Sequence, residues 1–291
     1  LAQADDIEIV GVSTVFGNAP LTVTDQTTRA LIAELKSSGF EAVPVYQGSS
    51  EPMNEGAPTA RIPAHERLRA VLEKEPLTIV ALGPMTTIAA ALHKRPDLQA
   101  KVTRLVAVMG RRRGHLFHPI EGGTARSLLG HGPVFRDFNF AQDEQASTAV
   151  LAMGLPMTFV PYEAARDIMI GGDTLDGMTA SGGAAAWVAQ RTRAWLGYWR
   201  EDIGRKGFYP FDLIAAAYLV QPSLLRCADV KLSVEDDVGV LGWLGFQGLF
   251  VLSAEERFSD PIATGQAGYC PEATHRVDEW LSRRLTAAPV R

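Results

Sequence analysis

Runs of apolar residues alternate with amphipathic stretches along most of the chain. The first run, residues 7–15, is rich in β-branched residues, as a strand buried on both faces requires. A short loop follows, and a helix is predicted from about Thr22, because Thr22 and Asp25 have the spacing of a capping box. Apolar residues recur along one face of this helix until Gly39, which ends it. The chain is therefore expected to open with a strand, a loop and a helix.

The same alternation continues through the middle of the chain. Further strands are predicted at residues 43–46, 77–82, 102–109 and 157–160, and helices at 64–72, 86–92, 184–198 and 212–220. Strands separated by helices form βαβ units, whose strands are parallel. No internal repeat or low-complexity linker divides the chain. The pattern predicts an α/β fold with an open, mostly parallel, Rossmann-like sheet and helices on both faces, in a single domain over residues 1–291.

The order of the elements is unusual at the start of the sequence. Residues 1–6 resemble the end of a helix that leads into the strand at 7–15. In a doubly wound fold, a strand and a loop come before such a helix. We therefore expect that a first strand and its loop are missing upstream of Leu1.

Composition and charge narrow the class of protein. Hydrophobic residues make up 46% and charged residues 21%, which is the balance of a packed globular protein. The net charge of -5 argues against nucleic-acid binding, which requires a basic face. No apolar stretch reaches the roughly 18 residues of a membrane span. Because no signal peptide opens the chain either, we expect a cytoplasmic protein that binds neither nucleic acid nor membrane.

The two cysteines, Cys227 and Cys270, lie far apart in the sequence. Two widely spaced cysteines predict neither a disulfide framework nor a cysteine-rich metal site. A reducing compartment fits this pattern best.

A glycine-rich segment at residues 110–133 follows the strand at 102–109. Loops longer than about 15 residues inside a compact domain are usually functional, so this segment is a candidate lid. Its arginine cluster, Arg111–Arg113, is expected to be a solvated loop. The alternative is a minor contribution to binding a phosphorylated ligand.

Polar residues directly after the strands are the first candidates for chemistry, because ligands bind beyond the carboxyl ends of the strands in open parallel sheets. Four places qualify, namely Asn18, the turn that starts at Leu82, the step from Met109 to Gly110, and Asp212 at the start of a helix. As alternatives, Asn18 is a simple turn residue and Asp212 a helix cap.

Two aromatic segments carry weaker signals. Residues 137–140 alternate polar and aromatic side chains, which places Asp137 and Asn139 on one face of an extended chain. The alternative for this segment is a half-buried strand. Trp195 and Trp199, four residues apart on a predicted helix, more often pack in a core than form a platform for a base.

Taken together, these segments resemble the inosine-uridine-preferring nucleoside hydrolase family across nearly the whole chain. Residues 9–18, IVGVSTVFGN, are similar to the family's second strand, which ends in a substrate-side asparagine. Residues 79–86, IVALGPMT, resemble its Leu-Gly-Pro strand and turn, and residues 106–110 resemble the strand that ends in Met-Gly. Asp137-Phe138-Asn139 resembles the Glu-Phe-Asn segment that grips the ribose, and residues 210–213 resemble the His-Asp pair that opens a late helix.

The resemblance implies a role for each of these positions. A calcium ion would sit at the bottom of the pocket, with a carboxylate from Asp212 and the backbone carbonyl of Leu82 among its oxygen ligands. The implied ribose contacts are Asn18, Met109, Asp137, Phe138 and Asn139, the implied base contacts are Trp195 and Trp199, and the implied catalytic positions are Asp137, Asn139 and Phe211.

The reaction that the resemblance implies is hydrolysis of the N-glycosidic bond of ribonucleosides to ribose and free base. It would pass through an oxocarbenium-like transition state attacked by a metal-bound water. Members of the family are usually homodimers or homotetramers.

Three features depart from the family pattern. The family's Asp-rich loop, which supplies the general base and most calcium carboxylates, has no counterpart in the sequence and would fall before Leu1. Phe211 stands where the family often has a leaving-group histidine, and Asp137 is shorter than the usual glutamate. One carboxylate and one carbonyl fall short of the roughly six to eight oxygens that calcium takes, so we expect a poor calcium binder and a poor hydrolase. The alternative function is a non-catalytic protein that binds nucleosides or small ligands.

Overall fold

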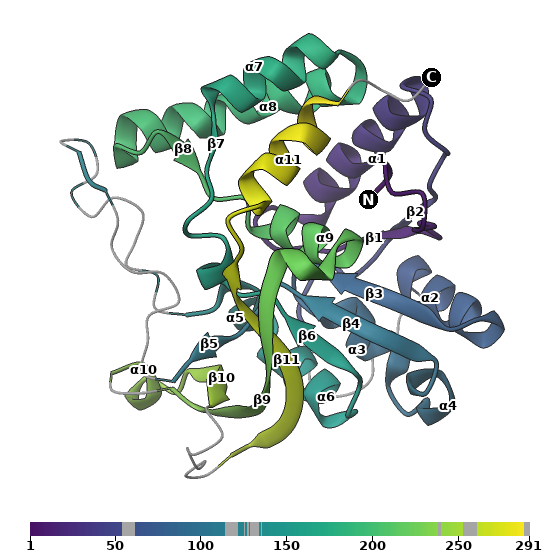
Figure 1. The fold of residues 1–291 in the computed structure, drawn as a ribbon. Coiled ribbons are helices and arrows are strands. Elements are labelled where there is room, and N and C mark those ends of the chain that lie inside the picture. The colour runs from purple at the N-terminus through teal and green to yellow at the C-terminus, as the bar shows by residue number, and fades with distance from the viewer. Residues whose placement is uncertain are drawn as a thin grey trace.

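The computed structural model describes residues 1–53, 62–113, 122–124, 126, 128, 134, 136–237, 240–252 and 261–287. Its largest sheet contains seven strands in the order β3-β4-β6-β11-β9-β10-β5 (Figure 1). Their bounds are β3 (Leu77–Ala81), β4 (Val102–Ala107), β5 (Arg111–Arg112), β6 (Met157–Phe159), β9 (Leu225–Asp236), β10 (Gln247–Leu252) and β11 (Ala263–Ala273). The run from β3 to β11 is parallel, and β9 is antiparallel to both of its neighbours. The predicted α/β class, with an open and mostly parallel sheet, is confirmed.

Two smaller sheets flank the large one. β1 (Val12–Thr14) pairs in parallel with β2 (Val45–Gln47), and β7 (Ile170–Gly171) pairs antiparallel with β8 (Gly207–Phe208). Only the last part of the predicted strand at 7–15 is therefore a strand. Residues 1–6 form turns instead of a helix end, with the N–H of Ala4 donating to the carbonyl of Leu1 at 2.9 Å.

The helices connect and cover the strands. They are α1 (Leu21–Ser37), α2 (Pro63–Lys74), α3 (Thr86–Leu92), α4 (Pro96–Gln99), α5 (Phe138–Gln142), α6 (Glu144–Ala152), α7 (Gly172–Ser181), α8 (Gly183–Tyr198), α9 (Phe211–Val220), α10 (Val240–Trp243) and α11 (Val277–Thr286). Short helical turns lie at η1 (Tyr162–Ala164), η2 (Trp199–Ile203) and η3 (Pro222–Leu224). No helix in the described part of the chain is long and apolar enough to cross a membrane.

The large sheet is buried on both faces. Successive side chains of a strand point to opposite faces. Accordingly, Leu105 and Ala107 of β4 join a core with α3 and α6, while Val106 joins a second core with α9 and α11. Such two-sided burial explains why the strand sequences are continuous apolar runs. The prediction of helices on both faces is confirmed.

The start of α1 differs from the predicted capping box. The helix begins at Leu21, directly after Pro20, and has no side-chain cap. Asp25 instead accepts hydrogen bonds from Thr14 at 3.1 Å and from Arg29 at 2.8 Å. The Arg29 hydrogen bond is the main cause that lowers the pKa of Asp25. Asp25 therefore ties α1 to β1.

Two further expectations are corrected next to the long glycine-rich segment. Residues 138–142 form helix α5 and not a half-buried strand, because Asp137 caps the helix by accepting the N–H of Phe140. Arg111 and Arg112 form strand β5 beside β10, and Arg111 is only 3% exposed, so the expected solvated loop is wrong for Arg111. Most of the candidate lid at residues 110–133 lies outside the described residues.

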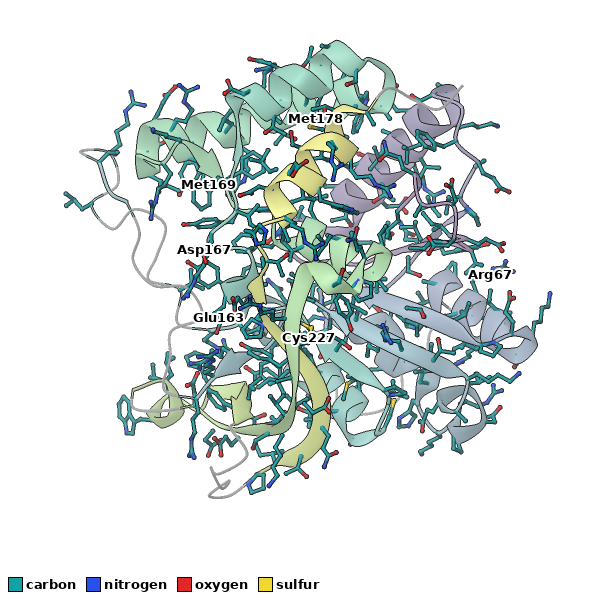
Figure 2. The ribbon with its side chains drawn as sticks, in the orientation of Figure 1. Arg67, Glu163, Asp167, Met169, Met178 and Cys227 are labelled. Carbon is teal, nitrogen blue, oxygen red and sulfur yellow. A yellow bond between two sulfur atoms is a disulfide. The ribbon has the colours of Figure 1, made fainter. Side chains whose placement is uncertain are left out.

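The cysteine expectation is wrong as well. Cys227 of β9 and Cys270 of β11 form a disulfide (Figure 2, Cys227 labelled). The two residues are 43 positions apart in sequence, but β9 and β11 are antiparallel neighbours and bring them side by side. The pairing was missed because neither strand was predicted from the sequence.

Candidate functional site

The loops after β1 and β3 meet at one edge of the structure. A Cβ atom placed on Gly17 would lie 3.8 Å from Pro84, and one on Gly83 would lie 3.4 Å from Val15. Asn18 and Leu82, the candidates carried by these loops, are both exposed, Leu82 to 45%. The loops that carry these two candidates at the carboxyl ends of the strands are thus brought together.

The end of β4 is joined to α5 by two hydrogen bonds. The side-chain amide of Asn139 donates to the carbonyl of Val108 at 2.8 Å, and the N–H of Gly110 donates to the carboxylate of Asp137. Gly110 has a φ of 93°, in the left-handed region that favours glycine. Met109 between them is 1% exposed and belongs to the core, so the structure does not expose it for the ribose contact that the resemblance implies.

Asp137 is a buried carboxylate in this arrangement, with 3% of its surface exposed. Burial raises its pKa to about 6, and the N–H groups of Gly110 and Phe140 and the charge of Arg111 oppose that rise. At neutral pH the group is therefore mostly ionised, and it becomes neutral in mild acid. Phe138, the next residue, is 43% exposed.

The start of α9 carries the second carboxylate. Phe211 packs its ring 6.0 Å from that of Tyr162 and 5.9 Å from that of Tyr209. Asp212 is open to solvent on one side, but protein atoms crowd it on the others, and the lost hydration raises its pKa to about 6. Because Tyr162 begins η1, the turn that comes after β6, this contact holds the start of α9 near the same edge of the sheet.

The two tryptophans have different environments. Trp195 is 45% exposed and stacks on Tyr198 with ring centroids 5.3 Å apart. Trp199 is fully buried and contacts Tyr209 edge-to-face at 5.1 Å. Only Trp195 presents a ring surface to solvent. The structure does not expose Trp199 for a base contact, and its place is in the aromatic cluster behind Phe211.

Glu163 and Tyr269 form a pair beside the end of β4 that the sequence analysis did not single out. The hydroxyl of Tyr269 donates to Glu163 at 3.1 Å (Figure 2, Glu163 labelled). A Cβ atom on Gly110 would lie 3.6 Å from the Tyr269 ring, so this pair stands beside Asp137. Burial raises the pKa of Tyr269 above its usual range, and the charge of Glu163 raises it further, which keeps the phenol protonated. The signal for Glu163 was its place just after the predicted strand at 157–160.

A second missed pair lies after β2. Ser49 and His65 are both buried and hydrogen-bonded through the Ser49 hydroxyl and the His65 Nε2 at 3.2 Å. Burial lowers the pKa of His65 to about 4, and the nearby Arg69 lowers it in the same direction. The imidazole is therefore neutral at physiological pH.

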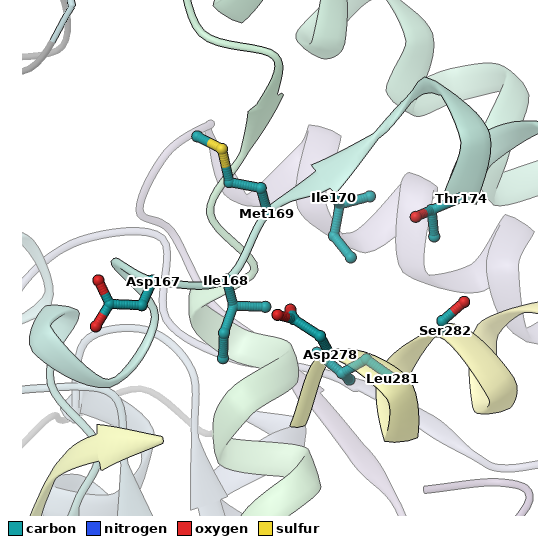
Figure 3. Close-up of a pocket in the computed structure, with 8 residues that line it drawn as sticks. All are labelled: Asp167, Ile168, Met169, Ile170, Thr174, Asp278, Leu281 and Ser282. Atoms are coloured by element: carbon teal, nitrogen blue, oxygen red, sulfur yellow. The ribbon is translucent and has the colours of Figure 1, made fainter. Parts of the chain in front are cut away.

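A separate cavity of about 450 Å³ lies between α7, α11 and residues 167–170 (Figure 3). Its walls combine apolar side chains such as Ile168 and Leu281 with the carboxylates of Asp167 and Asp278. None of the residues predicted from the sequence to form a site lines this cavity.

The described residues do not by themselves make a calcium site. No group of three or more His, Cys, Asp or Glu residues among them could hold a metal ion. Asp212 and the Leu82 carbonyl supply two oxygens, whereas calcium takes about six to eight.

The fold and its edge site define a doubly wound α/β protein with a candidate ligand site at the carboxyl ends of its parallel strands. The sequence matches the model of the inosine-uridine preferring nucleoside hydrolase family over residues 1–242. The chain belongs to this family.

Individual relatives are distant. The chain is 26% identical to uridine nucleosidase 1 of Arabidopsis thaliana, over 76% of this chain and 69% of the relative. It is 24% identical to the non-specific ribonucleoside hydrolase RihC of Salmonella heidelberg, over 98% of this chain and 92% of the relative.

Solved structures share the fold. A plant nucleoside hydrolase superposes with a TM-score of 0.77 at 19% identity, over 98% of this chain and 93% of the other. A purine-preferring ribonucleoside hydrolase from Gardnerella vaginalis superposes with a TM-score of 0.71 at 20% identity, over 97% of this chain and 90% of the other. At such identities the likeness establishes the fold alone.

Proposed function

We propose that this protein cleaves the N-glycosidic bond of ribonucleosides to release ribose and a free base. Family membership supports the substrate class. The observation that carries the proposal is the anchoring of Asp137 and Asn139 to the backbone of residues 108–110. Asn139 donates its amide N–H to Val108, which leaves its side-chain oxygen to accept a hydrogen bond from a ribose hydroxyl.

The chemistry expected of these residues is stabilisation of a cationic ribosyl group. The oxygen of water bonds to C1′ while the bond from C1′ to the base nitrogen breaks, and its electron pair leaves with the base. The carboxylates of Asp137 and Asp212 favour the positive charge that develops on the sugar. The attacking water gives up one proton to solvent, and because Phe211 has none to donate, the base takes its proton from solvent. Trp195 would flank the base, as the resemblance implies.

Calcium is the cofactor that the resemblance implies for this reaction. Asp212 and the backbone carbonyl of Leu82 would supply oxygen ligands to it, and these two are too few for a calcium site. A calorimetric titration of the protein with calcium chloride measures whether additional oxygens complete the site.

The test of the proposed activity is release of ribose from inosine, uridine, adenosine, guanosine and cytidine, with and without added calcium. We expect release from at least one of them, and a loss of about 100-fold in kcat/KM on substituting Asn139→Ala. The substitution Asp97→Asn, at an exposed residue, is the control and should leave kcat/KM unchanged. No release from any nucleoside under either condition would refute the activity.

The rate should also depend on pH in a defined direction. The pKa values of Asp137 and Asp212 are both about 6. Below that pH both carboxylates gain a proton and lose the charge that stabilises the ribosyl cation. We expect kcat/KM to fall as the pH drops from 7 to 5, and a flat profile over this range would contradict the roles given to these carboxylates.

The second candidate function is nucleoside binding without cleavage. Phe211 at the leaving-group position and the single carboxylate of the implied metal set favour it. Isothermal titration with inosine, followed by mass analysis of the recovered ligand, separates the two functions, because a binding protein returns the nucleoside intact. For either function we propose that the protein is a homodimer or homotetramer. Sedimentation velocity measures this oligomeric state.

A further inference from the structure

Two ion pairs that the proposed reaction does not use join the chain at β5 to the end of β9. Arg111 and Arg113 are two positions apart and meet Asp237 and Glu235, which are also two positions apart, at 2.5 Å and 2.9 Å. The Arg111 and Asp237 side chains are 4% and 0% exposed. An extended chain points alternate residues to one side, so the two arginines face the carboxylates together.

Stability alone does not account for the pair between Arg111 and Asp237. Removing two charges from water costs several kcal/mol per ion, and apolar residues of similar volume often stabilise a core equally well or better. The guanidinium of Arg111 is further fixed by the ring of Phe250, whose centroid is 4.6 Å away. A buried guanidinium that is held in one orientation can fix the position of the backbone next to it.

That neighbour is Asp137. Arg111 directly follows Gly110, whose N–H donates to the Asp137 carboxylate. The charged and titratable groups around Asp137 are Arg111 from β5, Tyr269 from β11 with its partner Glu163, and the adjacent Arg136, which pairs with Glu144. The charge of Arg111 opposes the rise in the pKa of Asp137 that burial causes.

We propose that Arg111 is a positioning residue for Asp137. Its ion pair with Asp237 anchors the chain directly after Gly110, whose N–H holds the Asp137 carboxylate. This inference rests on the proposed function, in which the Asp137 carboxylate favours the positive charge that develops on the sugar. It also gives a role to the arginine cluster that the sequence alone did not explain.

The test compares matched pairs of substitutions on the same two strands. Arg111→Met with Asp237→Leu removes both charges of the inner pair, so that no buried carboxylate is left alone. Arg113→Met with Glu235→Leu does the same to the outer pair and serves as the control. Arg111→Lys keeps the charge and tests whether charge alone restores the effect. A thermal melt of each variant confirms that it folds.

The readout is the titration of Asp137, followed by NMR of aspartate carboxyl carbons and assigned with Asp137→Asn. In the inner-pair variant we expect the midpoint of the Asp137 titration to rise by about one pH unit or more. The outer-pair control should keep the wild-type midpoint, and the midpoint of Arg111→Lys should lie between those of wild type and the inner-pair variant. The acid limb of kcat/KM should move up by the same amount. An unchanged Asp137 titration in the folded inner-pair variant would overturn the proposal.

The two hypotheses fail in different ways. If the wild-type protein cleaves no nucleoside, the proposed function fails, but the carboxyl titration still decides whether Arg111 acts on Asp137. If cleavage is observed and only the titration is unmoved, the proposed function stands and the positioning role does not.

Discussion

Loss of hydration at individual side chains shifts the pH at which they gain or lose a charge. Loss of hydration raises the pKa of both Asp137 and Asp212 to about 6. For Asp137, hydrogen bonds from backbone N–H groups and the charge of Arg111 offset part of this rise. His65 is held neutral by the same loss of hydration. The same physical cause therefore favours the uncharged form of an acid and of a base, and it acts in opposite directions on their pKa values.

The pKa of His65 leads to a prediction about stability. Unfolded histidine binds a proton below about pH 6.5, whereas folded His65 does so only below about 4, so acid favours the unfolded state in this window. Between pH 7 and 4.5, wild type should lose about 2–3 kcal/mol of unfolding free energy more than His65→Gln. Urea denaturation at both pH values measures the difference. His275→Gln, at an exposed position, is the control, and equal losses in wild type and His65→Gln would contradict the prediction.

Helix starts hold neighbouring elements together at the edge of the sheet. Asp143 caps α6 by accepting the N–H of Ala146 at 2.9 Å. Its other oxygen accepts the hydroxyl of Thr86, at the start of α3, and the N–H of Met53. One carboxylate thus joins two helices and the segment after β2, and it fixes the turn that carries Leu82.

Removing this carboxylate should be costly. Asp143→Ala loses a helix cap and leaves buried donors without a partner, for which we expect a loss of about 3 kcal/mol in unfolding free energy. Asp143→Asn keeps most of the geometry and should lose less. The comparison is Asp97→Ala, which breaks an exposed, solvent-screened ion pair and should cost far less unfolding free energy. Similar midpoints of chemical denaturation for Asp143→Ala and Asp97→Ala would exclude the role given to Asp143.

Over the whole molecule, the long antiparallel pair of β9 and β11 joins the parallel strands to the β10 and β5 edge. The disulfide between Cys227 and Cys270 locks this pair. Disulfides persist in oxidising compartments and are rare in the cytosol, so the pairing opposes the cytoplasmic location expected from the sequence. A cytoplasmic location and a single domain over residues 1–291 stay predictions.

The disulfide can be tested together with its contribution to stability. Peptide mapping under non-reducing conditions should recover Cys227 linked to Cys270. Replacing both by serine should lower the unfolding free energy by about 2–4 kcal/mol, because the cross-link closes a loop of 43 residues in the unfolded chain. Reductant should lower the melting temperature of the wild-type protein and leave that of the double serine variant unchanged. Free thiols in protein purified without reductant would contradict the pairing.

The sequence by itself determined the fold class and the order of the early strands and helices. Strands buried on both faces, such as β4, leave continuous apolar runs, and the helices between them have a clear period, so both signals are local. The family motifs placed Asn18, Leu82 and Asp212 after strands or at a helix start for the same reason.

Only the tertiary structure decided which distant groups meet. The pairing of β9 with β11, and with it the disulfide, depends on contacts between residues 43 apart, which leave no periodic signal. Asp137 became a helix cap because Phe140 and Gly110 present N–H groups to it. Arg111 became a buried partner of Asp237 across 126 positions, and no short stretch of sequence distinguishes such an arginine from a solvated one. Local patterns fix the elements, whereas long-range packing fixes the charge and environment of the site.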